Sequence, residues 1–434
     1  MPGKKILIAG AGIGGLTAAL ACLKRGFDVE VYEQAPALKE AGAGLQLSAN
    51  GNRALYELGL GDALKRLSCE ATGKEIRLWN TGETWKLFDL GAVSVEHYGY
   101  PYFTVYRPDL LGVLIDAVRA LKPDAIQLNA RCAGFEQDES GVTLLIGTGA
   151  VHGPAAADVG AAVVANAGAP RRVRGDALIG ADGVHSIIRQ GLFGADQPAF
   201  TGIMAWRGVI PMERLPERMR RMLGTNWVGP GGHIVHYPLN AGRLMNFVGV
   251  KERSDWQVES WNVRGTTEEF KADFAGWNED IHLMISAIEV PYKWALMTRA
   301  PLPQWSVGRV SLLGDACHST LPFLAQGAVM AIEDGFILAR ALAGHAGDGA
   351  NAGAHEEAGA ANGIALALAR YQAARIERTT RIVEGAAANA KRFHNPELAH
   401  SAGARAYVER EWNEARVKER YEWLFTYDVT KVAV

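Results

Sequence analysis

The sequence has few cysteines, almost no net charge and no long hydrophobic run, and each shortage excludes a class of protein. Its four cysteines form neither a CxxC pair nor a regular framework, so we expect reduced thiols and no disulfide scaffold. A formal net charge of -2 argues against a basic surface that binds nucleic acid or a membrane. The apolar run after Lys4 and Lys5 reaches glycine after four residues, too early for a signal-peptide core or a membrane span. We therefore expect a cytoplasmic protein.

Motifs of several catalytic classes are missing as well. The sequence contains no P-loop, no paired-histidine metal signature and no G-x-S-x-G elbow, so kinase, metal-enzyme and hydrolase functions have no supporting residues, and we expect no metal. Hydrophobic residues make up 48% and charged residues 21%, which is typical of a globular enzyme. A length of 434 residues suggests two domains of unequal size.

The first part of the chain has the pattern of a βαβ unit. Apolar strands are expected over 6–9 and 29–32, and helical spacing over 16–25 ends at Gly26. Further elements expected along the chain are helices over 50–58, 108–121 and about 326–342, and a strand over 310–313 that returns to the first domain.

The segments 74–90 and 200–250 have the pattern of antiparallel strands instead. Because such a block does not extend a parallel sheet, we expect it to form a separate layer. The predicted fold class is α/β: a Rossmann-like dinucleotide-binding domain with an inserted antiparallel-sheet substrate domain and C-terminal helices. The expected ranges are 1–72, 101–190 and 291–395 for the first domain, 73–100 and 191–290 for the second, and 396–434 for a C-terminal segment.

Two stretches are dominated by alanine and glycine. The first, 151–170, is expected to lengthen a hairpin, and the second, 344–363, to interrupt a helical region as a mobile loop. The segment 409–427 is rich in aromatic and charged residues and is expected to pack on a partner or on the substrate domain.

A glycine-rich motif joins the first strand to the first helix. Gly10, Gly12 and Gly15 fit G-x-G-x-x-G, and Gly14 lies between them. The three motif glycines permit, in order, a tight turn, close approach to a pyrophosphate and close helix–strand packing. Glu33 ends the second strand, where a carboxylate accepts ribose hydroxyls. The motif predicts a bound dinucleotide without distinguishing FAD from NAD; the alternative is a glycine-rich turn in a non-binding α/β domain.

Three later segments indicate FAD. Leu178–Arg189 reads LIGADGVHSIIR, Arg309–Ser319 reads RVSLLGDACHS, and Arg107–Leu110 opens a helix with RPDL. In this order and spacing the segments resemble the class A flavoprotein aromatic hydroxylases, the group of salicylate, 3-hydroxybenzoate and 6-hydroxynicotinate hydroxylases. The resemblance runs from about position 5 to about position 340.

The resemblance implies roles for individual residues. Asp315 is expected to bind the FAD ribityl chain and Arg107 to lie near the ribityl phosphate. Asp182 and Gly183 are similar to the pair that serves both FAD and the transient nicotinamide nucleotide. A carboxylate suits a polyol and an arginine suits a diphosphate; the alternatives are a helix N-cap for Asp315 and a surface salt bridge for Arg107. His318 is expected near the FAD phosphates.

Two further segments are expected to contact the flavin. Gly327 and Ala328 start a helix whose N-terminus points at the flavin pyrimidine in this family. A positive helix end there stabilises the negative charge of reduced flavin. The loop GAGLQL, which contains Gly44, is similar to the loop on the other side of the isoalloxazine.

The substrate residues are expected in the strand-like segment 231–238. In a strand, His233 and Tyr237 share one face and His236 lies on the other. Hydroxylases of 3-hydroxybenzoate and 6-hydroxynicotinate are similar here, with histidine and tyrosine facing the ring. We therefore expect His233 and Tyr237 to be catalytic and His236 to be solvated or capped; the alternative for His233 is a hydrogen-bonded core histidine.

The sequence departs from these relatives at Pro322 and Phe323, where they carry a pocket glutamine or histidine. We expect a more apolar pocket, so neither substrate is assigned by transfer. The predicted function is an FAD-dependent monooxygenase that uses NADH or NADPH and O2 to hydroxylate a phenolic or hydroxylated aromatic acid through a flavin hydroperoxide. The expected partners are small molecules only, with no nucleic acid and no membrane, and the expected assembly is a monomer or homodimer. The alternatives are an FAD oxidoreductase with a non-aromatic substrate, or a flavin-binding protein without turnover.

Overall fold

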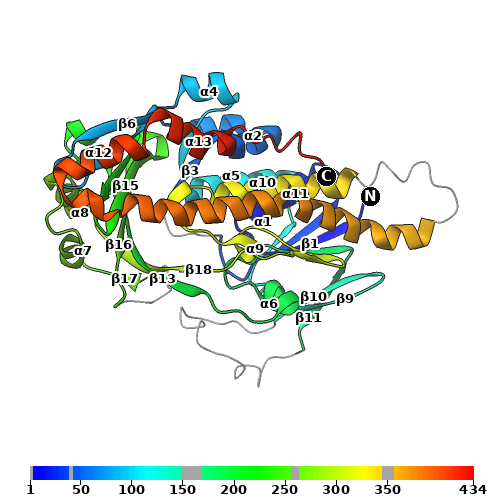
Figure 1. Ribbon diagram of the computed structural model, residues 1–434. Coiled ribbons are helices and arrows are strands. Elements are labelled where there is room, and N and C mark those ends of the chain that lie inside the picture. The colour runs from blue at the N-terminus through cyan, green and yellow to red at the C-terminus, as the bar shows by residue number, and fades with distance from the viewer. Residues whose placement is uncertain (1–2, 39–42, 148–168, 256–262, 345–355) are drawn as a thin grey trace.

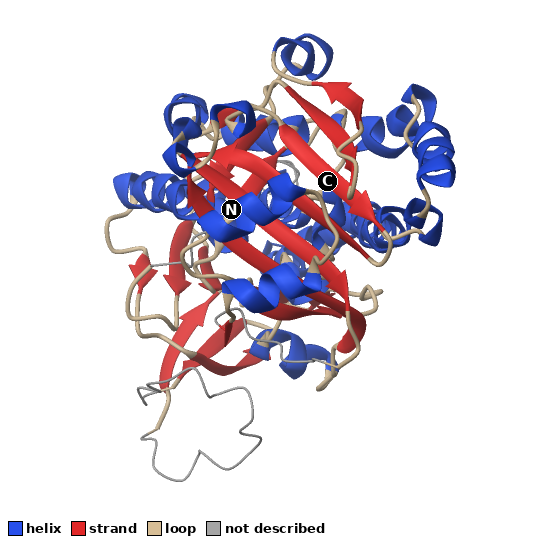
Figure 2. Cartoon of the chain, turned by 90° about the vertical axis from the view of Figure 1, so that its left-hand side faces the viewer, coloured by secondary structure: helices blue, strands red, loops and turns tan. Residues whose placement is uncertain are grey.

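The chain forms two large sheets that lie side by side, with long helices running across both (Figure 1). The computed structural model describes residues 3–38, 43–147, 169–255, 263–344 and 356–434. One sheet is mainly parallel and the other mainly antiparallel. Figure 2 shows the strands in red and the helices in blue. The predicted fold class, a Rossmann-like domain with an inserted antiparallel sheet and C-terminal helices, is confirmed.

The parallel sheet is built from segments that are far apart in the sequence. Its strand Lys5–Ala9 is buried along its apolar residues and pairs in parallel with a neighbour on each side. The two strands at one edge pair antiparallel. In spatial order the six strands are β19 (Ser306–Val307), β20 (Val310–Leu312), β12 (Ala177–Gly180), β1 (Lys5–Ala9), β2 (Asp28–Tyr32) and β8 (Ile126–Gln127).

The second sheet has eight strands. Neighbouring strands are antiparallel except for the pair Gly224–Gly229 and Gly73–Leu78, which is parallel and joins the two sequence blocks. The sheet also includes Tyr292–Thr298, so it continues past position 290, where we expected the inserted domain to end. In spatial order the strands are β17 (Val263–Arg264), β18 (Tyr292–Thr298), β13 (Ala199–Pro211), β16 (Leu244–Glu252), β15 (Gly232–Leu239), β14 (Gly224–Gly229), β5 (Gly73–Leu78) and β6 (Thr84–Asp89).

Two small antiparallel sheets complete the strands. β10 and β11 pair as a hairpin, and the alanine- and glycine-rich stretch lies between them; its residues 151–168 are outside the described part. The strands of these sheets are β11 (Arg171–Gly175), β10 (Gly141–Ile146) and β9 (Cys132–Asp138), and β3 (Gly44–Leu47), β7 (Phe103–Tyr106) and β4 (Cys69–Glu70).

The helices pack closely around the parallel sheet. An added Cβ at Gly335 would lie 2.7 Å from the backbone nitrogen of Ala18, so α1 and α10 touch through their backbones. The α-helices are α1 (Ile13–Leu23), α2 (Ala49–Glu57), α3 (Gly61–Leu67), α4 (Ala92–Tyr98), α5 (Arg107–Leu121), α6 (Ile187–Phe193), α7 (Thr267–Asp273), α8 (Glu279–Ala287), α9 (Asp315–His318), α10 (Gly327–Gly344), α11 (Glu356–Phe393), α12 (Ser401–Glu411) and α13 (Glu414–Phe425). Among them, none combines the length and hydropathy that a bilayer-spanning segment needs.

The C-terminal part corrects one expectation and confirms another. Of the stretch 344–363, residues 345–355 lie outside the described part, but 356–363 form the first turns of α11 rather than a loop. The aromatic segment packs on the protein itself: the ring of Phe425 lies 6.1 Å from that of Phe88 on β6 and 5.5 Å from that of Tyr98 on α4. The expected packing on the substrate layer is therefore present.

Candidate active site

The glycine-rich turn lies at the C-terminal end of β1. Gly10 has φ +104°, and a Cβ there would lie 2.3 Å from the carbonyl oxygen of Ala181. A Cβ at Gly15 would lie 2.1 Å from the carbonyl oxygen of Gly10. At Gly12, which is the N-cap of α1, an added Cβ meets no described atom within 4 Å, and no side chain caps the helix. The turn is therefore packed on the inside and open on the side of the helix N-terminus.

Gly14, which lies within the motif, and Glu33, the acid after the second strand, also pack or hydrogen-bond at this turn. A Cβ at Gly14 would lie 2.5 Å from a methyl of Leu313, so this glycine permits contact with the strand end of β20. Glu33 is half-buried, and its carboxylate accepts hydrogen bonds from the amides of Ala11 at 2.9 Å and Ala35 at 2.8 Å. Each carboxylate oxygen has a further lone pair, so both can still accept a ligand hydroxyl.

Asp182 and Gly183 follow β12, next to the glycine-rich turn. A Cβ at Gly10 would lie 3.1 Å from the Cα of Asp182, and Gly183 has φ +76°. The Asp182 carboxylate accepts hydrogen bonds from the hydroxyl of Ser186 and from the amide of Ile187 at 2.8 Å. Burial raises the pKa of Asp182, while these hydrogen bonds act in the opposite direction. The carboxylate thus holds the N-terminus of α6 in addition to any role toward a ligand.

Asp315 follows β20 at the same edge of the sheet. It is the first residue of α9, and Gly314, with φ +66°, occupies the N-cap position. Asp315 is therefore not an N-cap, which was the structural alternative. Its side chain is exposed. The carboxyl ends of β1, β12 and β20 meet along one edge, so the three motifs lie where open α/β sheets bind ligands.

The N-terminus of α10 lies beside this edge. Gly327 and Ala328 are half-buried, and the first turn contains no acidic residue. Gln326, the residue before the helix, is buried and donates a hydrogen bond of 3.0 Å to the hydroxyl of Ser48. Its side-chain oxygen accepts one of 3.1 Å from Asn50. This amide network fixes the start of α10 against α2 and was not predicted from the sequence.

The segment around Gly44 joins the two layers. Its amide donates a hydrogen bond of 2.9 Å to the side-chain oxygen of Asn246 on β16, and a Cβ at Gly44 would lie 2.7 Å from the Tyr237 ring. Gly42 of the GAGLQL loop is outside the described residues. Arg107 is half-buried at the start of α5, and its amide donates to the carbonyl of Ala43 at 2.9 Å. Glycine at position 44 therefore allows this segment to lie directly on β15 and β16.

The expected faces of β15 are confirmed. His233 is buried, and its ring lies 5.0 Å from the ring of Phe323, just before α10, and 5.0 Å from that of Phe393. Its Nδ1 lies 2.7 Å from Nε2 of His394. Burial, together with His394, lowers the pKa of His233 well below its usual value, so the ring is neutral at neutral pH. Phe323 is therefore an apolar neighbour of His233, as expected.

Tyr237 is buried on the same face as His233. Burial raises the pKa of Tyr237, and a hydrogen bond to Gln46 partly offsets that effect. The side-chain oxygen of Gln46 also accepts a hydrogen bond of 2.9 Å from the hydroxyl of Tyr102. Gln46, which comes from β3, therefore links two buried phenols.

His236 lies on the opposite face, but it is not solvated. It is buried, and its Nε2 accepts a hydrogen bond of 3.1 Å from the indole nitrogen of Trp227. Burial, with smaller contributions from Arg77 and Arg221, lowers its pKa to about 3. His236 is a neutral core histidine with a hydrogen-bonded ring, so of the two expected states, solvated or capped, the solvated one is wrong.

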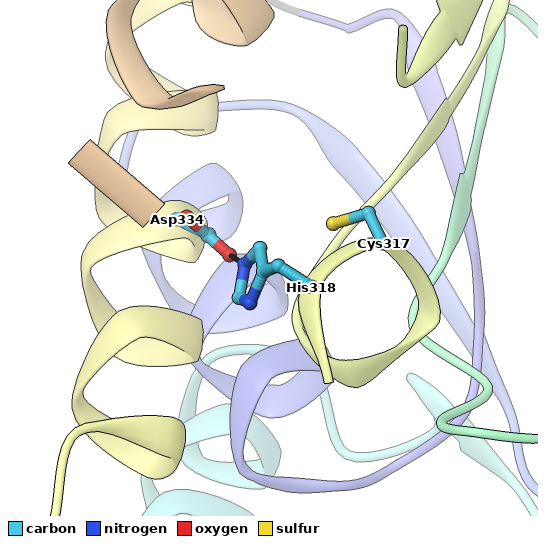
Figure 3. Close-up of side chains that lie close together, drawn as sticks. All are labelled: Cys317, His318 and Asp334. Carbon is cyan, nitrogen blue, oxygen red and sulfur yellow. Dashed lines mark hydrogen bonds and ion pairs between the residues drawn. The ribbon is translucent and has the colours of Figure 1, made fainter. Parts of the chain in front are cut away.

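His318 also differs from its expected place. Its ring is buried and points at Asp334 on α10, with Nε2 2.5 Å from the carboxylate (Figure 3). Burial opposes the charged form of His318, but the Asp334 carboxylate that the ring contacts outweighs it and raises the pKa well above its usual value. The side chain thus belongs to the core between α9 and α10 rather than to a phosphate site.

Cys317, His318 and Asp334 are the one group of three possible metal ligands among the described residues (Figure 3). Burial raises the pKa of the Cys317 thiol, so the metal-binding thiolate is disfavoured. Asp334 already pairs with His318 and accepts a hydrogen bond of 2.7 Å from Arg375. A guanidinium on the same carboxylate makes the group a charge-compensated polar cluster rather than a cation site.

This cluster continues into a buried ion network between α10 and α11. Arg375 also lies 2.7 Å from the Glu333 carboxylate, which in turn lies 2.8 Å from Arg378. Burial raises the pKa of Glu333, but the two arginines outweigh it and lower the pKa overall. Asn50 of α2 donates a hydrogen bond of 2.7 Å to Glu333, so the network reaches the Gln326 amide at the start of α10.

The same fold and motifs occur in known proteins. Residues 4–361 match the protein-family model described as "FAD binding domain". The chain is 34% identical over 430 residues to a 3-amino-4-hydroxybenzoate 2-monooxygenase of Streptomyces platensis, covering 99% of this chain and 97% of that protein. It is 33% identical over 429 residues to a 3-hydroxybenzoate 6-hydroxylase of Polaromonas naphthalenivorans, covering 98% and 96%. The structure of Klebsiella pneumoniae HpxO complexed with FAD and uric acid has a TM-score of 0.76 at 25% identity, covering 99% and 97%.

The parallel sheet carries a glycine-rich turn at its carboxyl edge, and the chain matches the FAD-binding family model. Together these two findings define an FAD-binding oxidoreductase. The chain belongs to this FAD-binding family and, within it, to the class A flavoprotein aromatic hydroxylases. It is an FAD-dependent monooxygenase of aromatic rings that uses a reduced nicotinamide nucleotide and O2.

Proposed function

We propose that FAD lies across the carboxyl edge of the parallel sheet and that a phenolic ring binds between it and β15. The FAD would be held by the glycine-rich turn, the acid after β2, the loops after β12 and β20, and the starts of β3, α5 and α10. The residues proposed to hold FAD are Gly10, Gly12, Gly14, Gly15, Glu33, Gly44, Arg107, Asp182, Gly183, Asp315, Gly327 and Ala328.

The fit to FAD is supported by features that the fold itself does not use. Among the described residues, no atom lies within 4 Å of a Cβ built at Gly12 and no side chain caps α1, so the helix N-terminus suits a pyrophosphate. Asp315 is exposed where a polyol chain would pass. The α10 N-terminus has no acid in its first turn, so its positive dipole end suits an anionic ring. FAD supplies the redox and oxygen-transfer chemistry when bound.

The proposed substrate is a phenol or other hydroxylated aromatic acid, of the kind named for the relatives. The observation that carries this proposal is the buried, neutral His233, which faces the start of α10 through Phe323. A free phenol titrates near pH ~10, so a positioned base must remove its proton before the ring becomes strongly nucleophilic. We propose His233 as that base and Tyr237 as the residue that orients the ring.

We also propose an FAD-binding domain and a substrate domain close to the expected ranges, with 291–298 moved to the substrate domain because β18 lies in its sheet. A cytoplasmic location is supported by four free cysteines, of which Cys22, Cys69 and Cys317 are buried. The proposed assembly is a monomer or homodimer, which light scattering of the holoenzyme measures.

The proposed function is tested with 3-amino-4-hydroxybenzoate, 3-hydroxybenzoate, 6-hydroxynicotinate and salicylate, each with NADH and with NADPH. NADH or NADPH oxidation should be slow alone and accelerate with a substrate, and mass spectrometry should show a product that has gained one oxygen. Product, hydrogen peroxide and nucleotide consumed are measured together, because a poor substrate gives peroxide instead of product. Equal oxidation rates with and without every ring compound would contradict an aromatic acid as substrate.

A further inference from the structure

His233 belongs to a chain of three hydrogen-bonded groups that reaches the protein surface. Its Nδ1 lies 2.7 Å from Nε2 of His394, and Nδ1 of His394 lies 3.0 Å from a carboxylate oxygen of Glu252. Both histidines are buried, whereas the Glu252 side chain is 54% exposed. The chain therefore connects the interior beside α10 with solvent.

The backbone holds these three groups in register. His233 pairs with Val250 across β15 and β16, and Glu252 lies two residues further along, on the same face as Val250. The amide of Gly231 donates a hydrogen bond to the carbonyl of His394 at 3.2 Å, and the carbonyl of Gly231 accepts one from the amide of Glu252 at 2.9 Å. Because one turn ties all three segments together, the side-chain contacts follow from the sheet register rather than from mobile surface side chains.

We propose that His394 and Glu252 are positioning residues of a proton relay that fixes His233 with Nε2 unprotonated and carries the substrate proton to solvent. This inference rests on the proposed function. Glu252, as a carboxylate, only accepts hydrogen bonds, so Nδ1 of His394 carries a proton; in the relay this is the only proton on that ring, and its Nε2 is an acceptor. Nδ1 of His233 then donates to it, which leaves Nε2 of His233 as the base.

The relay balances without any further reactant. The O–H bond of the substrate breaks and its proton binds Nε2 of His233, while the proton on Nδ1 of His233 passes to Nε2 of His394. The proton on Nδ1 of His394 passes to Glu252 and then to water, so the substrate is left as its anion and no additional charge stays on the buried rings. Return of a proton by the same route to the product oxygen restores both histidines.

The charges around these three hydrogen-bonded groups favour proton transfer from His233 toward Glu252. The hydrogen bond from His394 lowers the pKa of Glu252, and Lys251 acts in the same direction, so Glu252 is an anion at neutral pH. Around His233 the other ring neighbours are Phe323 and Phe393, which neither accept nor donate a proton.

The test uses the holoenzyme and the variants Glu252→Ala and His394→Phe, with Glu397→Ala as the matched control. Glu397 is also exposed and lies close to His394 in sequence, but it pairs with Arg410. The first readout is the tautomer of His233, from the nitrogen chemical shifts of histidine-labelled protein. In the wild type, His233 should carry its proton on Nδ1. In Glu252→Ala, the ring should be a mixture of the two tautomers.

The second readout is product formed per NADH, with the best substrate of the panel. Both relay variants should lose about tenfold or more, as when a histidine's orienting group is removed, with FAD retention and flavin reduction unchanged. Glu397→Ala should match the wild type in both readouts. His233 protonated at Nε2, or wild-type coupling in both relay variants, would overturn the relay. A wild type that hydroxylates no compound of the panel would instead contradict the proposed function, and the tautomer measurement would still decide the hydrogen-bond direction.

Discussion

Glu33 accepts a hydrogen bond from the backbone amide of Ala11, so the acid that follows β2 is tied to the glycine-rich turn that follows β1. The same carboxylate accepts the amide of Ala35. Glu33 therefore has two proposed tasks, to shape the turn and to bind a ribose. Asp315 is exposed and would contribute to FAD binding without shaping the fold around it.

This difference gives the first prediction. Glu33→Ala should weaken FAD binding and also lower the melting temperature of the apoprotein, whereas Asp315→Ala should weaken FAD binding alone. A lost charge-assisted hydrogen bond is worth roughly 1.5–3 kcal/mol, which corresponds to about 10- to 150-fold in FAD affinity. Asp62→Ala is the control, because Asp62 is likewise an exposed acid in the first turn of a short helix. Titration of apoprotein with FAD, followed by flavin fluorescence, measures each affinity; wild-type affinity in both variants would contradict the proposed site.

The second prediction separates the two functions of the glycine-rich turn. Gly12→Ala places a methyl group where no atom of the described residues lies within 4 Å, so the apoprotein should keep its melting temperature while FAD binding weakens at least tenfold. Gly15→Ala places its Cβ 2.1 Å from the carbonyl oxygen of Gly10, so the apoprotein itself should be destabilised. Calorimetry of both apoproteins and FAD titration test the pair. Unchanged FAD affinity in Gly12→Ala would mean that the pyrophosphate does not lie at this turn.

Local patterns in the sequence were enough to predict most elements, together with the turns and strand faces on which the candidate site residues lie. Strand, turn and helix around Gly10 follow from local glycine and apolar spacing, and the face of His233 follows from the two-residue repeat of a strand. Residues 356–363 were predicted to be part of a loop but are helical. Their alanine-rich composition has no distinguishing pattern, because alanine supports a helix as readily as it occurs in a low-complexity loop.

The features that the sequence did not predict are contacts between residues far apart along the chain. His394 meets His233 across 161 positions and Gln326 meets Ser48 across 278, and no local pattern carries such pairings. Arg375 and Arg378 have the spacing of an exposed helix face, and only the packing of α10 on α11 buries them. The parallel pairing of β5 with β14 was also not predicted, because it depends on the order of strands in the sheet and not on a local pattern.

The buried ion network gives the third prediction. Arg375→Met should destabilise the protein by about 3–5 kcal/mol, because Glu333 and Asp334 would remain buried with less compensating charge. Arg405→Met is the control, since Arg405 is exposed and its pair with Glu83 is worth no more than about 1 kcal/mol. Urea unfolding of the apoprotein, followed by tryptophan fluorescence, measures both. If the unfolding free energy of Arg375→Met fell by as little as that of the control, the network would contribute little to stability.

The fourth prediction concerns the two histidines of β15. His233→Ala should keep FAD and its reduction but lose hydroxylation by roughly 10²–10⁴-fold, because the proposed base is removed. His236→Gln should remain well coupled, since an amide oxygen can still accept from Trp227 on the far face. The pKa of His233 lies well below its usual value, so the wild type should stay coupled from pH 8 down to pH 6. Product per NADH in each protein tests this; good coupling in His233→Ala at pH 7 would exclude His233 as the base.

The last prediction concerns acid stability. Burial lowers the pKa of His236 to about 3, whereas an unfolded histidine titrates near pH ~6.5. Between these values the unfolded state binds more protons than the folded state, so this histidine makes stability fall as the pH falls. The expected slope is about 1.4 kcal/mol per pH unit from this one group, and His233 acts in the same direction.

His236→Gln removes this titrating group but keeps an acceptor for the Trp227 indole, so its unfolding free energy should depend less steeply on pH between 4 and 6 than that of the wild type. His400→Gln is the control, because it makes the same substitution at an exposed histidine and removes no buried ring. The measurement is urea unfolding of the apoprotein at pH 4, 5, 6 and 7. The difference between the variant and the wild type isolates His236 from the buried acids and from His233, which titrate in both proteins. An equal slope in wild type and His236→Gln would show that the buried ring does not resist protonation as its surroundings indicate.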